Sequence, residues 1–395
     1  MPGRDDTPVM PPERTLLRGG ALNLLLFSFG CIVALLAAEV FLRLYNPFGL
    51  RLWGDRIVLP RNQGQVLRNT ANPRLPATIL YSRNSLGLRG PEPPASFAFA
   101  LTVIAVGGST TESRYQSDGD TWPDLTSRAL AAHFRDLWMN NAGLDGHSTY
   151  GHLMLLEQHL LPLRPTVLVF LVGVNDVGRE GPKQVDDAIS AEGGASLLTR
   201  LARVSALAAT VQNLRRTEDA RMARLFVFGD LNLSRLEHLT YTGRRPEKAL
   251  REHRESYLPG YRERLSMIVR VCRKAGIVPV LVTQPALYGP VIDDRTGVDL
   301  GTMVVNDKQR INGALAWDIL ELYNDVTREV GREHRASVVE LARKLPKSSR
   351  LFYDFVHFTG EGAQAVAKVV APQLCQALAR ARPQFLTKEC PEPQP

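Results

Sequence analysis

From residue 101 onward, the sequence alternates between short apolar runs and longer segments with helical spacing. The runs "LTVIAV" at 101–106, "LWMNNAG" at 137–143 and "PTVLVFLVGVND" at 165–176 suit strands that are short and buried on both faces. Between them lie "DTWPDLTSRALAAHF" at 120–134 and "YGHLMLLEQHLLPL" at 150–163, whose apolar residues recur at helical spacing. Strands that alternate with helices in this way predict parallel β-α-β units. The chain is therefore expected to fold as an α/β protein.

The second half of the chain continues this alternation after an interruption. Residues 181–250 fit the pattern poorly, because a helical stretch is followed by a polar, arginine-rich piece. We interpret them as an insertion above the sheet, which could be a lid, part of a substrate pocket or surface decoration. The later elements predicted are a helix at 256–276, a strand at 277–285, a helix at 311–334, a strand at 336–342 and a helix at 359–381.

The N-terminal region contains an apolar stretch without a charge, "ALNLLLFSFGCIVALLAA" at 21–38. About 18 apolar residues can span a bilayer as a helix, so we predict a transmembrane anchor, with a cleaved signal peptide as the alternative. Basic residues on the two sides of the span are nearly balanced and do not set its orientation. A short tail before the span followed by one globular domain is the usual layout of a signal anchor. The protein is thus expected to be single-pass, with its domain outside the cytoplasm.

Composition divides the chain into five parts. Residues 45–100 are rich in Pro, Gly, Asn and Arg, which indicates a linker with a few extended segments. The predicted organisation is a tail at 1–20, an anchor at 21–44, this linker at 45–100, an α/β domain at 101–382 that includes the insertion, and a tail at 383–395.

Charge and cysteine usage narrow the possible partners. The net charge is +8, but basic and acidic residues are interspersed without a nucleic-acid-binding motif, so no nucleic-acid partner is expected. The four cysteines form no CxxC pair and no Cys/His cluster with zinc spacing, so neither a metal nor a cofactor is expected. Cys375 and Cys390 could pair in an oxidising compartment, or all four could remain free thiols.

Polar residues follow several of the predicted strands. Ser109 follows the first strand, Asn175 follows the strand at 166–172, and Asp354 and His357 lie between the last strand and the last helix. Ligands of parallel α/β sheets bind at the carboxyl ends of the strands. A serine needs a nearby base to become a nucleophile, and the histidine needs a carboxylate to orient it. Backbone N–H groups and an amide side chain could stabilise an oxyanion, so this set predicts acyl transfer.

Four blocks of the sequence resemble those of the SGNH (GDSL-type) hydrolases. The blocks are "GGST" at 107–110, "NAGLDGHST" at 141–149, "GVND" at 173–176 and "DFVH" at 354–357. The resemblance covers roughly 101–380 and implies a three-layer α/β sandwich with a mostly parallel, flavodoxin-like sheet, here preceded by one transmembrane helix.

The same resemblance assigns roles to individual residues. It implies a catalytic triad of Ser109, Asp354 and His357, with Gly146 and Asn175 in the oxyanion hole. Gly143 is the second candidate for the glycine of the second block. The chain departs from the family at Gly108, where many members carry aspartate beside the serine.

A membrane-anchored serine esterase follows from these features. We expect it to hydrolyse or transfer acyl groups, with O-acetyl groups of envelope or exported carbohydrates as the substrates that its compartment suggests. Lipid acyl esters or thioesters are alternative substrates. A non-catalytic anchored binding or assembly protein on the same fold is the alternative from another class.

Overall fold

The centre of the molecule is a parallel sheet of five strands in the order β11-β8-β7-β5-β6. The structure, a computed structural model, describes residues 14–45, 52–54, 56–70, 72–181, 197–222, 231–241 and 243–392. The strands are β5 (Leu101–Gly107), β6 (Leu137–Asn141), β7 (Val167–Leu171), β8 (Val278–Val282) and β11 (Ser337–Val339). The first of them lies between the second and the third, which is the flavodoxin-like order that was expected.

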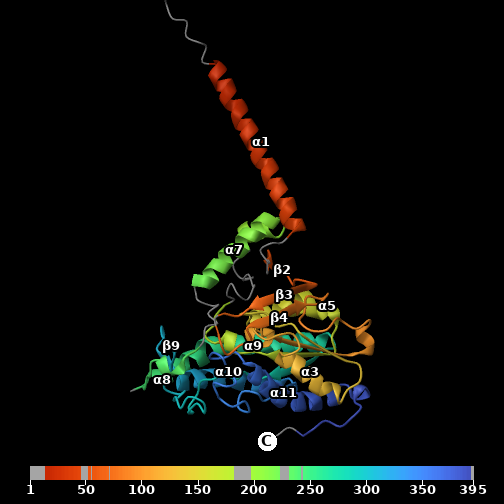
Figure 1. Cartoon of the computed structure of the whole chain (residues 1–395), viewed down its shortest axis with the longest axis vertical. Helices are drawn as coiled ribbons and strands as arrows, with labels where there is room; N and C mark the ends of the chain where they lie inside the picture. Colours follow the sequence, from red (N-terminus) through yellow and green to blue (C-terminus); the bar gives the residue numbers. More distant parts are fainter. Residues whose placement is uncertain are drawn as a thin grey trace, which may run out of the picture.

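Helices cover both faces of this sheet (Figure 1). One face carries α3 (Trp122–Ala131) and α11 (Gly360–Ala381). The other carries α4 (Thr149–Leu155), α5 (Leu161–Leu163), α9 (Leu258–Lys274) and α10 (Gly313–Glu333). Between α4 and α5 lies η2 (Leu156–Leu160), a π-helical turn. The three-layer α/β sandwich predicted from the sequence is confirmed.

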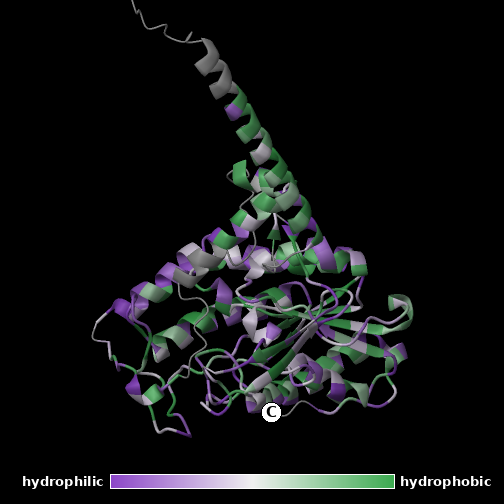
Figure 2. Cartoon of the chain, turned by 45° about the horizontal axis from the view of Figure 1, so that its top comes forward, coloured by the Kyte–Doolittle hydropathy of each residue, from purple (hydrophilic) through white to green (hydrophobic). Residues whose placement is uncertain are grey.

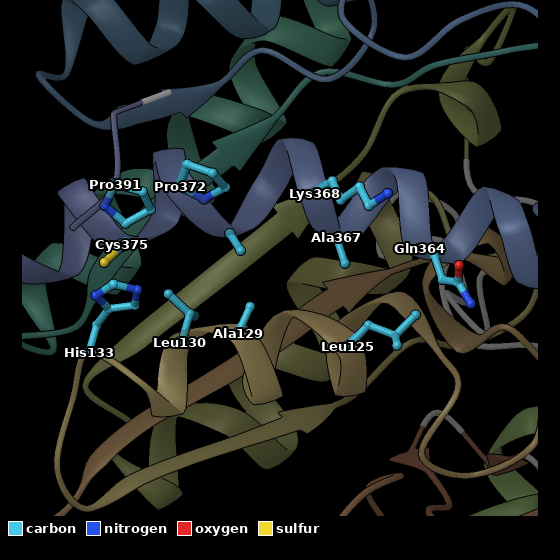
Figure 3. A pocket seen from close by; sticks show the side chains of 11 residues that line it. Leu125, Ala129, Leu130, His133, Gln364, Ala367, Lys368, Pro372, Cys375 and Pro391 are labelled. Carbon is cyan, nitrogen blue, oxygen red and sulfur yellow. The ribbon is translucent and has the colours of Figure 1, made fainter. Parts of the chain in front are cut away.

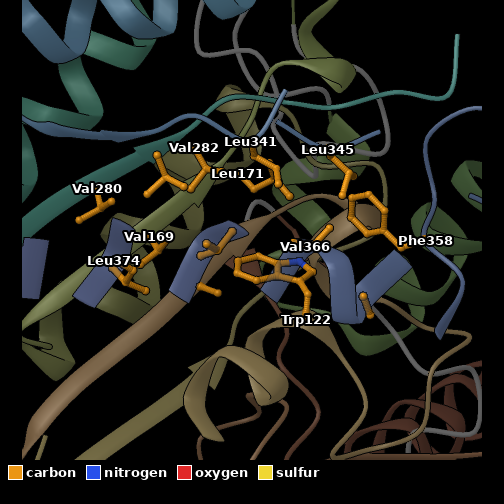
Figure 4. Close-up of a cluster of buried hydrophobic side chains, with 14 of the residues drawn as sticks. Trp122, Val169, Leu171, Val280, Val282, Leu341, Leu345, Phe358, Val366 and Leu374 are labelled. Atoms are coloured by element: carbon orange, nitrogen blue, oxygen red, sulfur yellow. The ribbon is translucent and has the colours of Figure 1, made fainter. Parts of the chain in front are cut away.

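The two faces of β7 show why its sequence is apolar throughout. Val167, Val169 and Leu171 belong to the core beneath α3 and α11, whereas Leu168 and Phe170 belong to the core on the other face. Successive side chains of a strand point to opposite faces, so a strand covered on both sides needs a continuous apolar run. Figure 4 shows the first of these cores, in which Trp122 lies among side chains from the sheet and α11.

The ends of the two helices on the first face are defined by their caps. The Thr121 side chain accepts a hydrogen bond from the Asp124 N–H at the start of α3, and Thr359 does the same for the Gly362 N–H at the start of α11. Such caps stabilise a helix by about 1 kcal/mol. At the other end of the chain, a disulfide joins Cys375 of α11 to Cys390. The sequence had left this pairing open.

Residues 52–100 pack onto the domain. Strand β1 (Leu52–Trp53) pairs with β2 (Arg56–Ile57), and β3 (Gln63–Arg68) pairs with β4 (Thr78–Arg83), both antiparallel. Leu52, Ile57 and Leu88 are buried in the core beside α9 and α10. This part of the chain therefore contributes two strand pairs and core side chains to the packed body.

The first helix, α1 (Arg14–Leu44), stands apart from the body (Figures 1 and 2). Its residues from Leu22 to Leu44 are long and apolar enough to cross a membrane, and none of that stretch is buried inside the molecule. Within the described ranges it is the one helix with this property.

The insertion contributes three further helices among its described residues. They are α6 (Leu197–Ala202), α7 (Ala206–Met222) and α8 (Arg245–Glu252). Helix α7 contacts α1 and β1. The remaining short elements are η1 (Phe97–Phe99), α2 (Ser109–Glu112), η3 (Val174–Asp176), η5 (Leu233–Arg235), η6 (His253–Tyr257), β9 (Val304–Asn306), β10 (Ile311–Asn312) and η7 (Pro383–Phe385).

Candidate active site

Strand β5 ends in two glycines, and the one-turn helix α2 begins at Ser109. A Cβ atom on Gly107 would lie 2.2 Å from Thr111 Oγ1 and 2.7 Å from the Leu171 carbonyl oxygen. A Cβ atom on Gly108 would lie 2.2 Å from Asn175 Nδ2. Glycine is therefore needed at both positions, because a side chain at either one would displace the neighbouring residues that lie against the backbone there. The sequence has Gly108 where many of the hydrolases that it resembles carry aspartate. In this structure, the Asn175 amide occupies the space that a side chain at residue 108 would need.

The loop before α11 brings a histidine to this serine. Asp354 Oδ1 accepts hydrogen bonds from the N–H groups of Val356 at 2.9 Å and His357 at 2.8 Å. Its second oxygen, Oδ2, lies 2.6 Å from His357 Nδ1. His357 Nε2 lies 2.7 Å from Ser109 Oγ. The structure thus brings the three residues together in one chain of hydrogen bonds, the arrangement in which an imidazole can take the proton of a serine hydroxyl.

The surroundings of His357 shift the ionisation of both members of the His–Asp pair. Burial alone would lower the pKa of His357, but the charge and hydrogen bond of Asp354, together with the charge of Asp145, raise that pKa above its ordinary 6.5. Burial would raise the pKa of Asp354, yet the charge and hydrogen bond of His357 and the two backbone N–H donors lower it below its ordinary 3.8. The carboxylate is thus ionised at neutral pH and stabilises an imidazolium.

The Tyr353 ring stacks on the His357 ring, with centroids 5.5 Å apart and planes inclined by 11°. The Tyr353 N–H donates to the carbonyl oxygen of His357 at 3.0 Å. Gln116 Nε2 crosses from the loop after α2 and donates to the carbonyl oxygens of Phe358 at 2.9 Å and Thr359 at 3.0 Å. The histidine loop is therefore tied to the chain that follows Ser109.

Two glycines were candidates for the second block, and their surroundings differ. The Gly143 N–H donates to Asn141 Oδ1 at 2.8 Å, and a Cβ on Gly143 would lie 2.2 Å from the Glu112 nitrogen. Gly143 therefore serves the packing of the loop against α2. Gly146 has a φ of +77°, a backbone conformation that favours glycine.

Asn175 lies in η3, directly after β7. Its Nδ2 donates to the His147 carbonyl oxygen at 3.0 Å and is the atom that a side chain on Gly108 would strike. The amide group has two donor hydrogens, so one of them can serve an oxyanion while the other bonds His147. The next residue, Asp176, accepts from the Thr149 N–H at 3.1 Å and pairs with Arg264 at 3.3 Å, which joins η3 to the start of α4.

The cavity beside Ser109 is small, with a volume of about 10 Å³. This is about the space that one water molecule needs. The lining residues are Ser109, Thr110, Ser113, Tyr115, Gln116, Tyr353, His357 and Phe358. Residues of the insertion that the structure describes are not among them.

A larger, apolar groove lies elsewhere, between α3 and α11 (Figure 3). Its volume is about 400 Å³, and Leu125, Ala129, Ala367 and Pro372 are among the residues that line it. None of the residues predicted for the site lies in it. Larger cavities therefore lie away from Ser109, and the hydrogen-bonded serine, histidine and aspartate identify the small cavity as the candidate active site.

Two buried arginines from the segment before β5 were missed by the sequence analysis. Arg89, whose side chain is 2% exposed, donates to the carbonyl oxygens of Glu112 at 2.8 Å and Ser113 at 2.7 Å, and also to that of Gln116. Its Nε pairs with Asp118 at 2.7 Å. These acceptors lie in α2 and the loop that follows it, so Arg89 braces the turn that carries Ser109.

The second of these arginines, Arg83, holds the side chain of Glu112. Glu112 Oε1 accepts from Arg83 at 3.1 Å and from the Tyr81 hydroxyl at 2.8 Å, while its Oε2 accepts from the Asp145 N–H at 2.7 Å. Glu112 therefore links strand β4 to the loop that contains Gly146. The dipeptide "LR" at 88–89 and the arginine at 83 carry no local signal for this role, because their partners are distant in the sequence.

Comparisons with known proteins address the family and the fold. The model of the GDSL-like lipase/acylhydrolase family matches residues 105–365. Among solved structures, an acetyl xylan esterase is 16% identical, with a TM-score of 0.38, over 70% of this chain and 99% of that one. A lipase/acylhydrolase from Enterococcus faecalis is 15% identical, with a TM-score of 0.39, over 70% of this chain and 95% of that one. No curated protein matches this sequence.

Proposed function

Since this chain belongs to the GDSL-like lipase/acylhydrolase family and is an ester-hydrolysing enzyme, we propose that Ser109 is its nucleophile, His357 its general base and Asp354 the residue that orients the histidine. The observation that carries this proposal is the pair of short contacts, 2.7 Å from Ser109 Oγ to His357 Nε2 and 2.6 Å from His357 Nδ1 to Asp354 Oδ2.

The reaction follows from these contacts. Ser109 Oγ attacks the ester carbonyl carbon while His357 Nε2 takes the hydroxyl proton, and a tetrahedral oxyanion forms. The N–H groups of Ser109 and Gly146 and the amide of Asn175 are proposed to stabilise that oxyanion. Collapse breaks the bond to the alcohol, which leaves with the proton from His357. A water molecule, deprotonated by the same histidine, then cleaves the acyl-enzyme and restores Ser109.

The small cavity supports a short acyl group. A space that fits about one water molecule suits the methyl group of an acetyl ester and excludes a long lipid chain unless the lining residues move. We therefore propose short-chain ester hydrolysis, with O-acetyl groups of envelope or exported carbohydrates as the substrate class, over hydrolysis of lipid acyl esters.

We also propose that α1 anchors the enzyme in a membrane with the catalytic domain on the extracytoplasmic side. The length and apolar character of Leu22–Leu44, none of which is buried inside the molecule, support the anchor. The Cys375–Cys390 disulfide supports the extracytoplasmic location of the domain, because disulfides persist in oxidising compartments and are rare in the cytosol.

A p-nitrophenyl ester series tests the proposal. The full-length protein should hydrolyse the acetate ester at least about tenfold faster than the octanoate ester, in keeping with the size of the cavity. Ser109→Ala should lower turnover by about 10⁴-fold or more, and a fluorophosphonate probe should label Ser109. Labelling of another residue, or equal turnover by the wild type and the Ser109→Ala variant, would refute the assignment.

A further inference from the structure

Helices α6 and α7 form a hairpin with a small core of its own. Ala202 and Ala209 are fully buried, and Ala208 and Trp53 pack against them. This cluster is separate from the two cores that flank the central sheet. The hairpin is therefore held in place by its attachments more than by burial against the domain.

One attachment joins the hairpin to the last turns of α1. Glu39 Oε1 accepts a hydrogen bond from the Ala206 N–H at 2.8 Å, and Glu39 Oε2 accepts from the Leu207 N–H at 3.0 Å and the Ser205 hydroxyl at 2.9 Å. A carboxylate at the first N–H groups of a helix is favoured by hydrogen bonding and by the helix dipole. Arg43 pairs with Glu39 at 2.8 Å and also donates to the Val204 carbonyl oxygen at 2.5 Å.

A second attachment joins the hairpin to β1. The Asn213 side chain accepts from the Leu52 N–H at 3.2 Å and donates to the Leu52 carbonyl oxygen at 2.8 Å. Trp53 Nε1 donates to the Arg203 carbonyl oxygen at 3.1 Å. The hairpin is thus fixed where α1 meets the body, and Figure 1 shows α7 leaving this junction in a direction transverse to α1.

The outer side of the hairpin is apolar and exposed. On α6, Leu197 is 74% exposed and Leu201 is 48% exposed, one turn apart. On α7, Val211 and Leu214 are 42% and 50% exposed, and Val204 in the connecting turn is 68% exposed. Residues three or four apart lie on one helix face, so Leu197 and Leu201 share a face of α6, and Val211 and Leu214 share a face of α7. We name these four side chains, together with Val204, the hairpin stripe.

Basic residues accompany the hairpin stripe. Arg200, Arg203 and Arg215 are exposed on the same two helices and their connection. Apolar side chains flanked by arginines are typical of helices that lie in a membrane interface, where the arginines contact headgroups.

We infer that the hairpin stripe is buried in the surface of the bilayer that α1 crosses, so that the α6–α7 hairpin holds the catalytic domain in a fixed attitude to that membrane. The inference rests on the proposed anchoring by α1. The bilayer is the occupant that the structure favours, because the bonds from Glu39 and Arg43 place the hairpin at the last turns of the membrane helix. Figure 2 shows the hydrophobic colour of α1 continuing onto the hairpin at this junction.

Fluorescence quenching in vesicles tests this inference with the full-length protein. A fluorophore is attached to Val211→Cys in a Cys31→Ser background, since Cys31 is the exposed free cysteine and Cys272 is buried. The matched control is Ile292→Cys, because Ile292 is an apolar residue that is 61% exposed in the loop after β8. The expected result is that brominated phospholipid quenches the probe at residue 211 at least about twofold more than the probe at residue 292, while aqueous iodide does the reverse.

The other outcomes separate this inference from the anchor and from the catalytic proposal. Equal iodide quenching at both positions, with no effect of brominated lipid at residue 211, would overturn it. Protection of residue 211 from both quenchers would also overturn it, by indicating a protein partner or a second copy. Carbonate extraction of the same vesicles tests α1 directly: release would overturn anchor and hairpin together, whereas retention with a water-exposed residue 211 would overturn the hairpin alone. Turnover of p-nitrophenyl acetate by the same preparations tests the triad independently.

Discussion

Replacement of Arg89 by methionine tests whether the segment before β5 shapes the active site. In the structure the buried Arg89 guanidinium donates to the carbonyl oxygens of Glu112, Ser113 and Gln116 and pairs with Asp118 at 2.7 Å. Methionine has a similar length and can fill most of the space, but it donates no hydrogen bond. Arg89→Met therefore removes the brace and leaves four acceptors without their donor.

The size of the effect follows from the burial of these groups. A hydrogen bond that involves a charged group contributes about 1.5–3 kcal/mol, and removal of one partner of a buried ion pair costs about 3–5 kcal/mol. The side chain of Asp118 is 29% exposed, so water can replace part of its lost interaction. We expect the free energy of unfolding to fall by about 3–5 kcal/mol in total. At about 2 °C for each kcal/mol, the value for large domains, the melting temperature falls by about 6–10 °C.

The effect on turnover comes from the position of α2. Ser109 begins this one-turn helix and Glu112 ends it, so a displacement of Glu112 also displaces Ser109. A displacement of about 1 Å in a catalytic group can reduce the rate by about 10²-fold. We expect kcat for p-nitrophenyl acetate to fall by about 10- to 100-fold, with KM changed much less.

The assay combines thermal melting with kinetics, normalised by fluorophosphonate titration of competent sites. Arg89→Lys keeps the charge and some of the donors, and it should recover part of both losses. The matched control is Arg262→Met, since Arg262 pairs with Glu329 and Glu333 at the surface, where such pairs contribute about 0–1 kcal/mol. A melting temperature that falls while kcat per competent site stays at the wild-type value would refute the positioning role, and no change in either would refute the brace.

Two further predictions concern the site itself. The rate of hydrolysis should rise with pH, with a midpoint above 6.5, because His357 acts in its neutral form and Asp354 raises its pKa. In Asp354→Asn the midpoint should move to lower pH and kcat should fall by about 10⁴-fold. An unmoved midpoint would contradict the assigned pairing of His357 with Asp354. Gly108→Ala should reduce kcat by at least about tenfold, since the new Cβ would lie 2.2 Å from Asn175 Nδ2 and would displace the amide that we propose as an oxyanion donor. The control Gly360→Ala, with no atom within 4 Å of the added Cβ, should keep the wild-type rate, and equal rates for the two variants would count against the role of Asn175.

The parts of the fold that the sequence predicted well are those that depend on local pattern. The apolar runs at β5 and β7 are continuous because both faces of these strands are covered, and this requirement is visible in the sequence itself. The cap at Thr359 and the three-residue spacing of Asp354 and His357 are local in the same sense. The four blocks, each placed after a predicted strand, predicted that Ser109 and His357 meet at one edge of the sheet although they are 248 residues apart in sequence.

The parts that the sequence did not predict depend on partners that are distant in the chain. Arg83 and Arg89 lie in a segment with little periodicity, and their role becomes visible only when Glu112 and Asp118 lie beside them. The Glu39 carboxylate looks like an interruption at the end of an apolar span until its contacts with Ala206 and Leu207 are seen. Long-range ion pairs and caps of this kind leave no spacing that a single sequence can reveal.

The brace from Arg89 bears on proteolytic removal of α1, the proposed membrane anchor. A protease that cuts between Tyr45 and Leu52 would free a domain that keeps Arg83 and Arg89 against α2. A cut between Arg89 and β5 would free a domain that still contains Ser109, His357 and Asp354. Arg89, the donor to the buried carbonyl oxygens of Glu112 and Ser113, would then belong to a separate peptide that only non-covalent contacts hold in place. The position of the cut would then decide whether removal of α1 leaves an active esterase or a fragment that loses activity when that peptide dissociates.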